Sequence, residues 1–417
     1  MKSKCTSNLK GCQDNHSNPG DKDPRTHHIQ YFIHCLKYLP EQYTHLETNR
    51  LTLVHFAIQS LDILGFFNDN DDAKIESHFG INKDEIIKWI YSLQIVSKEY
   101  EITQNDDSFD GDYVPYESTK NDNNEGGFQG GTVFHTRHDD HDDNNNYNSK
   151  SKLGKYRQCH LAMTYSALCT LIALGDNLQR VDKQAIIMSM KTLQQSNGSF
   201  QCISSGSEND LRFLYCSCAI SFFLNDWSGI DKGKALDYIR SCRSYDGAYG
   251  LIPGQEAHGG STYCAVASLF LMGELNNELG SVKDSLDTCT AREELIQWCV
   301  FRQKQGLQGR PNKNEDTCYS FWIGACLAIL GCDHLLDRNS LQRFVIGCQS
   351  NLGGFTKFEN GLYPDLLHSF YSLAWLSFPV DQKGDDNALE YFSSLNEINS
   401  ALGLCQRHVD HYCFSYK

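Results

Sequence analysis

Residues 316–331 have the sequence DTCYSFWIGACLAILG, in which small, aliphatic and aromatic side chains occupy most faces of a helix. Similar stretches recur along the chain, and successive starts are separated by 50, 50, 56 and 50 residues. The starts are His160, Asp210, Gly260, Asp316 and Leu366. A sixth stretch, RLTLVHFAIQSLDIL at 50–64, precedes them. A helix that is apolar all round has to be surrounded, so these segments predict six inner helices.

Short turns and more polar segments separate the apolar stretches. The turns pair glycine with an aromatic residue, and a Gln or Arg stands four residues before most of them (Gln194, Arg243, Arg302 and Gln349). The turns are Gly126-Gly127-Phe128, Gly198-Ser199-Phe200, Gly247-Ala248-Tyr249 and Gly353-Gly354-Phe355, with Gly306-Leu307-Gln308 as a degenerate member. Amphipathic segments such as 183–194 and 291–303 fit outer helices. The repeat predicts an all-α fold, and we favour a closed α6-α6 barrel (toroid) over an open solenoid.

The chain has 417 residues and a formal net charge of -15. Residues 103–149 hold 11 acidic and 2 basic residues and include a low-complexity run from His138 to Asn146. This composition cannot bury much apolar area, so we expect a disordered acidic insertion there, with a metal site as the less favoured alternative. A disordered polar tail is expected at 1–26, and 27–417 are expected to form a single α-α barrel catalytic domain.

Composition also disfavours several classes of protein. The acidic balance argues against a nucleic-acid binder. No apolar run reaches the ~18 residues that a membrane span requires, and no hydrophobic stretch at the N-terminus resembles a signal peptide. The 18 cysteines contain no CxxC pair, and several lie in apolar stretches, so we expect mostly reduced core residues. A cytoplasmic location is therefore predicted.

Polar residues of the inner segments gather near their N-termini, which share one rim in a barrel of this kind. Asp316, Cys318 and His368 offer a carboxylate, a thiolate and an imidazole, three ligands that zinc accepts with a fourth position open. A helix cap, a core thiol and a core histidine would explain the same three residue types.

A second set of rim residues is suited to an anion. It comprises His258, Arg310, Lys313 and Tyr319, which offer charge and hydrogen-bond donors to a phosphate or diphosphate. An ordinary solvated basic loop is the alternative. Aromatic residues such as Phe213, Tyr263, Phe321 and Trp322 are predicted to line the barrel below both sets. Zinc, diphosphate and an apolar interior together suggest a thiol alkylated by an allylic diphosphate.

These residues resemble those of the protein prenyltransferase β-subunits, and among them those of type I geranylgeranyltransferases. The resemblance extends from about His28 to Phe378, interrupted by the acidic insertion. The stretches that carry it are LPEQYTHLETNRLTL (39–53), IIKWIYSLQ (86–94), HLAMTY (160–165), GSENDLRFLYC (206–216), NDWSGID (225–231), HGGSTYC (258–264), GRPNKNEDTCYSFWIG (309–324) and GGFTK (353–357).

The resemblance implies a role for each matching residue. The implied zinc ligands are Asp316, Cys318 and His368, and the implied diphosphate-binding residues are His258, Arg310, Lys313 and Tyr319. The implied isoprenoid pocket comprises Thr52, Arg212, Tyr263, Cys264 and Trp322. The implied peptide-binding residues are His160, Glu208, Phe213 and Leu367, with Arg212 also near the peptide carboxylate. Lys357 stands where farnesyltransferases have an Asp that assists magnesium, although the stretch from Lys357 to His368 is one residue longer than usual.

The resemblance also implies an activity and partners. The expected enzyme is the catalytic β-subunit of a type I protein geranylgeranyltransferase, which transfers a 20-carbon group from geranylgeranyl diphosphate to the cysteine of C-terminal CaaX motifs, X being mostly Leu or Phe. Transfer would use a zinc-bound thiolate, with one Zn²⁺ per β-subunit and no required Mg²⁺. The implied partners are an α-subunit shared with farnesyltransferase and CaaX proteins such as Rho, Rac and Rap GTPases.

Three other functions compete with this one. A terpene cyclase would need an acidic DxDD-type motif inside the barrel, and the comparable run at 69–72 lies in a polar stretch. The related enzyme that acts on Rab proteins is expected to have Asp rather than Lys after its GGx turn. A non-catalytic helical scaffold would have no reason to keep the zinc and diphosphate residues together.

Overall fold

The computed structural model describes residues 24–68, 72–96, 125–132, 158–280, 291–379 and 394–415. All six predicted inner helices are found within these ranges. They are α2 (Arg50–Ile63), α7 (Leu161–Ala173), α9 (Leu211–Leu224), α11 (Gly259–Met272), α14 (Cys318–Ile329) and α16 (Leu366–Leu376). The outer helices are α1 (Pro24–Lys37), α4 (Lys83–Ser92), α8 (Lys183–Leu193), α10 (Lys232–Ser241), α13 (Ala291–Val300) and α15 (Arg338–Gly347).

The remaining described elements are short, apart from the last helix. They are η2 (Glu41–Asn49), α3 (Asp72–Lys74), η3 (Ile75–Phe79), α12 (Leu275–Leu279), η5 (Asp333–Leu335) and α17 (Gln406–Ser415). Three antiparallel pairs of two-residue strands complete the set: β1 (Gln94–Ile95) with β2 (Gly127–Phe128), β3 (Phe200–Gln201) with β4 (Asn209–Asp210), and β5 (Ile398–Asn399) with β6 (Leu404–Cys405).

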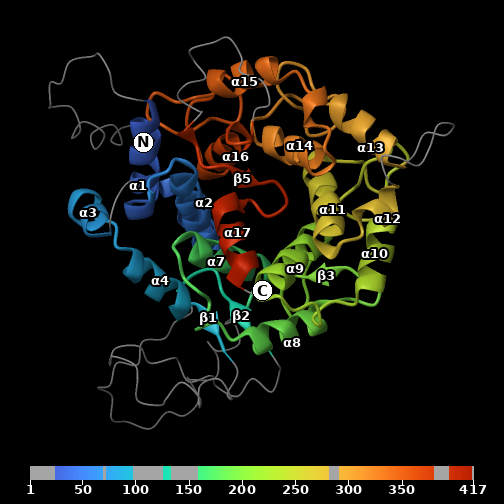
Figure 1. The fold of residues 1–417 in the computed structure, drawn as a ribbon, viewed down its shortest axis with the longest axis horizontal. Coiled ribbons are helices and arrows are strands. Elements are labelled where there is room, and N and C mark those ends of the chain that lie inside the picture. Colours follow the sequence, from blue (N-terminus) through green and yellow to red (C-terminus); the bar gives the residue numbers. More distant parts are fainter. Residues whose placement is uncertain are drawn as a thin grey trace, which may run out of the picture.

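The inner helices form a closed ring (Figure 1). Each packs against the next in chain order, and α16 packs back against α2. The predicted closed toroid is therefore confirmed, and the open solenoid is excluded. Burial separates the two layers as predicted: 12 of the 14 residues of α9 are buried, whereas α10 buries Ala235, Tyr238 and Ile239.

The N-termini of the inner helices are joined around one rim by a repeated backbone hydrogen bond. In each case the first N–H groups of one helix reach a carbonyl in the loop that precedes the next helix. The bonds are Leu51 to Gly130, Leu161 to Cys202, Leu211 to Leu251, Gly259 to Gly309 and Thr317 to Lys357. These N–H groups have no partner within their own helix, so the bonds satisfy them and align the loops along one edge.

The glutamine that precedes a turn holds the start of the next outer helix. Gln194 accepts from the backbone N–H of Asp231 and donates to its carbonyl, and Gln303 does the same for Asp337. The fourth repeat therefore uses Gln303 rather than the predicted Arg302, because its degenerate turn is two residues shorter: Gln303 pairs with Leu307, four residues on, whereas Gln194 pairs with Phe200, six residues on.

Helix α1 completes the outer layer beside the last repeat. His28 is buried, its Nδ1 accepts from the backbone N–H of Gly354 at 2.9 Å, and its ring stacks on Phe355. Since α1 begins at Pro24, the last three residues of the predicted tail are helical, and 1–23 lie outside the described residues.

The range predicted as an acidic insertion, 103–149, contains a packed part. Residues 125–132 are described, Phe128 of β2 is fully buried, and Gly130 accepts from the start of α2. This piece contains the predicted turn Gly126-Gly127-Phe128, which belongs to the repeat and not to the insertion. The rest of the range lies outside the described residues.

The C-terminal segment covers the end of the barrel opposite the rim. Figure 1 shows α17 inside the outline of the ring. Ala401 and Leu402, between β5 and β6, are 1% exposed, and their carbonyls accept hydrogen bonds from Tyr215 and Tyr165 of the inner helices.

Two further predictions are met in the described ranges. The 14 cysteines whose side chains are described are free thiols, and all of these but Cys332 are buried. None of the helices described is both long enough and apolar enough to cross a membrane.

Candidate active site

The rim is lined by the residues that cap the inner helices. His160 caps α7 and His258 caps α11, each through Nδ1 at 3.1 Å from the backbone nitrogen two residues on. Asp210 caps α9 and Asp365 caps α16 through carboxylate oxygens. Asp316 accepts in the same way from the backbone N–H of Cys318 at the start of α14. Capping therefore fixes these side chains at the rim, and in His160 and His258 it uses Nδ1 and leaves Nε2 for other contacts.

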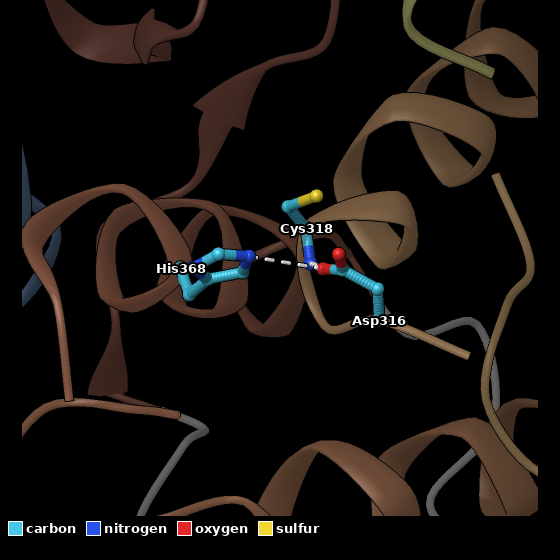
Figure 2. A group of neighbouring side chains, drawn as sticks. All are labelled: Asp316, Cys318 and His368. Carbon is cyan, nitrogen blue, oxygen red and sulfur yellow. Dashed lines mark hydrogen bonds and ion pairs between the residues drawn. The ribbon is translucent and has the colours of Figure 1, made fainter. Parts of the chain in front are cut away.

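Asp316, Cys318 and His368 come together as predicted (Figure 2). One ligand atom from each lies within 4.8 Å of the others. His368 Nε2 is 3.2 Å from Asp316 Oδ1, and its Nδ1 is 2.6 Å from Asp365 Oδ2. The residues are brought together because α14 and α16 are neighbours in the ring.

The protonation of this group fits a site that receives a cation. Burial alone would lower the pKa of His368, but hydrogen bonds to Asp316 and Asp365 outweigh it and raise the pKa to about 9. Burial, followed by the nearby charge of Asp316, raises the pKa of the Cys318 thiol well above its ordinary value. Without a metal, the negative charge of the Asp316 carboxylate is thus balanced by the positive charge of protonated His368. A metal ion in that place would restore a free Nε2 lone pair and the thiolate, so the donor set fits zinc.

The predicted anion-binding residues are only partly brought together. Tyr319 Oη lies 2.9 Å from His258 Nε2, and Arg310 forms a 2.8 Å ion pair with Glu256. Lys313 is exposed, and its backbone N–H bonds to the carbonyl of Arg310 at 3.4 Å.

The cap bond determines the form of His258. Because Nδ1 accepts from Gly260, the ring proton of the neutral form is on Nε2 and is donated to the Tyr319 oxygen. The hydroxyl proton of Tyr319 is then available for an anion. Burial, followed by the charge of Arg310, lowers the pKa of His258, so this residue is a neutral donor and not part of a cationic cluster.

Lys357 lies beside the predicted metal group. Its Nζ is 3.5 Å from Asp316 Oδ2, and its side chain is half-exposed. The extra residue in the stretch from Lys357 to His368 therefore does not remove the lysine from the rim.

Of the predicted peptide residues, His160, Glu208 and Phe213 lie around α7 and α9. The rings of His160 and Phe213 meet edge to face at 5.9 Å. Arg212 pairs with Asp210 at 2.7 Å and with Glu208 at 3.3 Å, which places it with this group at the rim. Leu367, on α16, is 38% exposed.

The predicted lipid residues Tyr263, Cys264 and Trp322 lie in the second turn of their helices. Tyr263 contacts Trp322 with ring centroids 5.1 Å apart, and Cys264 beside it is buried. Thr52 is on α2, with Oγ1 3.5 Å from the sulfur of Met163. Of the assigned lipid residues, Arg212 is the one that lies with the peptide group instead.

The family described as the prenyltransferase alpha-alpha toroid domain matches residues 24–404. The chain belongs to this family. It is 39% identical over 368 residues to the geranylgeranyl transferase type-1 subunit beta of Arabidopsis thaliana, which covers 88% of each chain. It is 38% identical over 351 residues to the protein of the same name from Dictyostelium discoideum, covering 84% of this chain and 89% of the other.

Structural comparison agrees on the fold. The chain superposes on Candida albicans protein geranylgeranyltransferase-I complexed with GGPP with a TM-score of 0.69, at 21% identity, covering 94% of this chain and 99% of that one. The two relatives place this chain, within the prenyltransferase toroid family, among the transferases of the type-1 geranylgeranyl β-subunit group.

The structure adds residues to the site that sequence analysis missed. Asp365 holds His368 through Nδ1, and Glu256 holds Arg310. A line of hydroxyls also crosses the interior, from Tyr165 to Tyr215 at 3.4 Å and from Tyr215 to Tyr263 at 3.2 Å. Each tyrosine stands five residues after the capping residue of its helix, so the spacing within the repeat could have predicted that the three tyrosines lie side by side.

Proposed function

We propose that this chain transfers a geranylgeranyl group from its diphosphate to the cysteine thiol of C-terminal CaaX motifs. One observation carries the proposal: the consecutive residues Cys318 and Tyr319 belong to two different groups at the start of α14. Cys318 is part of the potential metal group, and Tyr319 contacts His258 of the potential anion group. Adjacent sites for a thiolate and a diphosphate are what alkylation of a thiol by an allylic diphosphate requires.

The leaving group is assigned to the second site. As the bond from sulfur to the first lipid carbon forms, the bond from that carbon to the diphosphate oxygen breaks, and negative charge collects on the departing diphosphate. Tyr319 donates its hydroxyl proton toward that charge, and Arg310 and Lys313 supply positive charge. Lys357 adds a cation on the metal side of the site, which is the proposed reason that Mg²⁺ is not required.

Asp316, Cys318 and His368 are the proposed ligands of one zinc ion. Zinc bound there would supply the thiolate form of the substrate cysteine at neutral pH. Asp365 accepts a hydrogen bond from Nδ1 of His368, which would leave Nε2 to bind the metal.

The same proposal covers the partners and the remaining pockets. Thr52, Tyr263, Cys264 and Trp322 are assigned to the lipid, and His160, Glu208, Arg212, Phe213 and Leu367 to the end of the peptide. The two curated relatives are named as beta subunits, and we propose that this chain also works with an α-subunit, in the cytoplasm, on CaaX proteins of the small GTPase kind.

The test is a transfer assay on the chain co-expressed with an α-subunit. Peptides ending in CVLL and CVLS are each offered the 20-carbon and the 15-carbon diphosphate, with and without Mg²⁺. We expect the 20-carbon lipid on the Leu-ending peptide without Mg²⁺. Transfer of the 15-carbon lipid to the Ser-ending peptide instead would overturn the assignment of lipid and peptide.

Thr52→Trp tests the lipid pocket within this assay. A large ring at this position on α2 is expected to shorten the space for the lipid and to shift preference toward the 15-carbon donor by about tenfold or more. Val54→Trp, on the same helix, is the control for bulk. Unchanged donor preference in Thr52→Trp would remove Thr52 from the pocket.

A further inference from the structure

The barrel is closed at its base by a segment that does not belong to the repeat, and a single buried carboxylate anchors it. Asp62 lies in the last turn of α2, and its side chain is fully buried. It forms an ion pair with Arg407 and accepts from His408 Nε2 at 2.9 Å, both from α17. A buried carboxylate with two cationic or hydrogen-bonding partners is a specific attachment, because leaving either side unpaired is costly.

The backbone around Asp62 is attached to the same segment. Asn396 donates its backbone N–H to the carbonyl of Ile63 at 2.8 Å, and its side chain donates to the carbonyl of Asp62 at 2.6 Å. The C-terminal segment is thus attached to the end of α2 at two places. Asn396 binds it before the loop that joins β5 to β6, and Arg407 and His408 bind it after that loop.

That loop, residues 400–403, reaches into the barrel. Tyr165 donates to the carbonyl of Leu402 at 2.9 Å, and Tyr215 donates to the carbonyl of Ala401 at 3.1 Å. Gly403 has a φ of +64°, which turns the chain back toward β6 beside Tyr165. The hydroxyl of Tyr215 also contacts the hydroxyl of Tyr263, which is assigned to the lipid pocket. Tyr215 therefore connects the loop to the proposed lipid pocket.

We propose that the loop 400–403 is the floor of the lipid pocket and that Asp62 is the positioning residue that fixes its height. This inference rests on the proposed function, because it assigns a lipid to the space above the tyrosines. The floor limits how long a lipid chain the barrel accepts, and Asp62 acts on that limit through the C-terminal segment without touching the lipid.

The test measures the preference among lipid donors of different length, and not the transfer activity alone. The chain with its α-subunit is given 15-, 20- and 25-carbon diphosphates, and kcat/KM is determined for each. Asp62→Asn keeps the shape of the side chain but removes its charge, and it is expected to raise the 25-carbon to 20-carbon ratio about tenfold or more. Leu402→Ala lowers the floor while keeping its backbone hydrogen bonds, and it should shift the ratio in the same direction.

Leu341→Ala is the matched control, because Leu341 is fully buried on the outer helix α15 and loses the same volume elsewhere. It should lower stability without changing the ratio. An unchanged ratio in Leu402→Ala would overturn the assignment of the loop 400–403 as the floor of the lipid pocket. A shift in Leu402→Ala without one in folded Asp62→Asn overturns the role of Asp62. If the wild-type protein transfers no lipid at all, the proposed function fails instead.

Discussion

The two ends of the barrel are built from the same helices but differ in chemistry. At the rim, helix starts are capped by side chains, including His160, His258 and Asp365, because free N–H groups attract polar acceptors. At the base, five of the six inner helices end at a left-handed residue. These residues are Gly65, Gly175, Asn225, Gly273 and Gly331. Glycine closes a helix with its backbone and brings no functional group. Helix polarity itself therefore places the reactive side chains at one end.

The strongest test of this contrast removes a metal ligand at the rim. Cys318→Ala is expected to lose bound zinc and to lower transfer by more than about 100-fold, because three protein ligands hold a catalytic zinc. Zinc content by mass spectrometry and transfer to a Leu-ending peptide measure both effects. Cys326→Ala, eight residues further along the same helix and also buried, is the control. If Cys318→Ala kept zinc and activity, the metal assignment would be wrong.

Replacing a glycine of positive φ with alanine should lower stability more at the rim than at the base. Gly198, in a rim turn, has a φ of +91°, and a Cβ there would lie 1.9 Å from the carbonyl oxygen of Lys234. Gly175, at the end of α7, has a φ of +87° and no neighbouring atom within 4 Å of such a Cβ. Gly198→Ala should therefore lower the free energy of unfolding by about 3 to 5 kcal/mol, and Gly175→Ala by about 1 kcal/mol.

Denaturant unfolding of the two glycine variants measures how much free energy of unfolding each one loses. Equal losses would mean that the rim turn relaxes around the added methyl group, and that strain in φ accounts for both positions. A larger loss at Gly175 would contradict the comparison altogether.

A smaller effect is expected from Lys357 at the rim. Lys357→Ala removes the cation beside Asp316 and should lower transfer in the absence of Mg²⁺ by about tenfold, with partial recovery when Mg²⁺ is added. Lys304→Ala removes an exposed cation of the same type and should change neither quantity. Full Mg²⁺-independent activity in Lys357→Ala would show that this lysine does not replace magnesium.

How much the sequence reveals also differs between the two ends. The helix starts were predictable to within two residues, because the apolar stretches begin directly after His or Asp caps. The grouping of Asp316, Cys318 and His368 followed from the ring order and from the family resemblance. By contrast, the pairing of Glu256 with Arg310 depends on how two loops meet in space, and no spacing in the sequence encodes it.

The base was not predictable from the repeat. Residues 394–415 have no counterpart in the other repeats, and the partners of Asp62 are more than 300 positions away in the chain. An acidic residue at the end of an apolar stretch has the pattern of an exposed helix terminus, and only the tertiary structure shows that Asp62 is buried.

The barrel interior between the two ends supplies the smallest expected effect. His55 on α2 is 3% exposed, packs against Phe56, Tyr165 and Phe370, and has a buried Nδ1 without a partner among the described residues. Burial lowers its pKa from 6.5 to about 3. A buried polar atom without a hydrogen bond is costly, so His55→Phe should raise the free energy of unfolding by about 1 kcal/mol at pH 7.5.

The same residue predicts a dependence on acid. Between pH 6.5 and about 3 the unfolded chain binds a proton on His55 and the folded chain does not, so stability falls as pH falls, by up to about 1.4 kcal/mol per pH unit. This loss should be absent in His55→Phe and should persist when the exposed His334 is replaced by Gln. Urea unfolding at pH 7.5 and 5.5 measures it. A parallel decline of the wild type and His55→Phe would show that the acid sensitivity lies elsewhere, in groups such as the capping histidines of the rim.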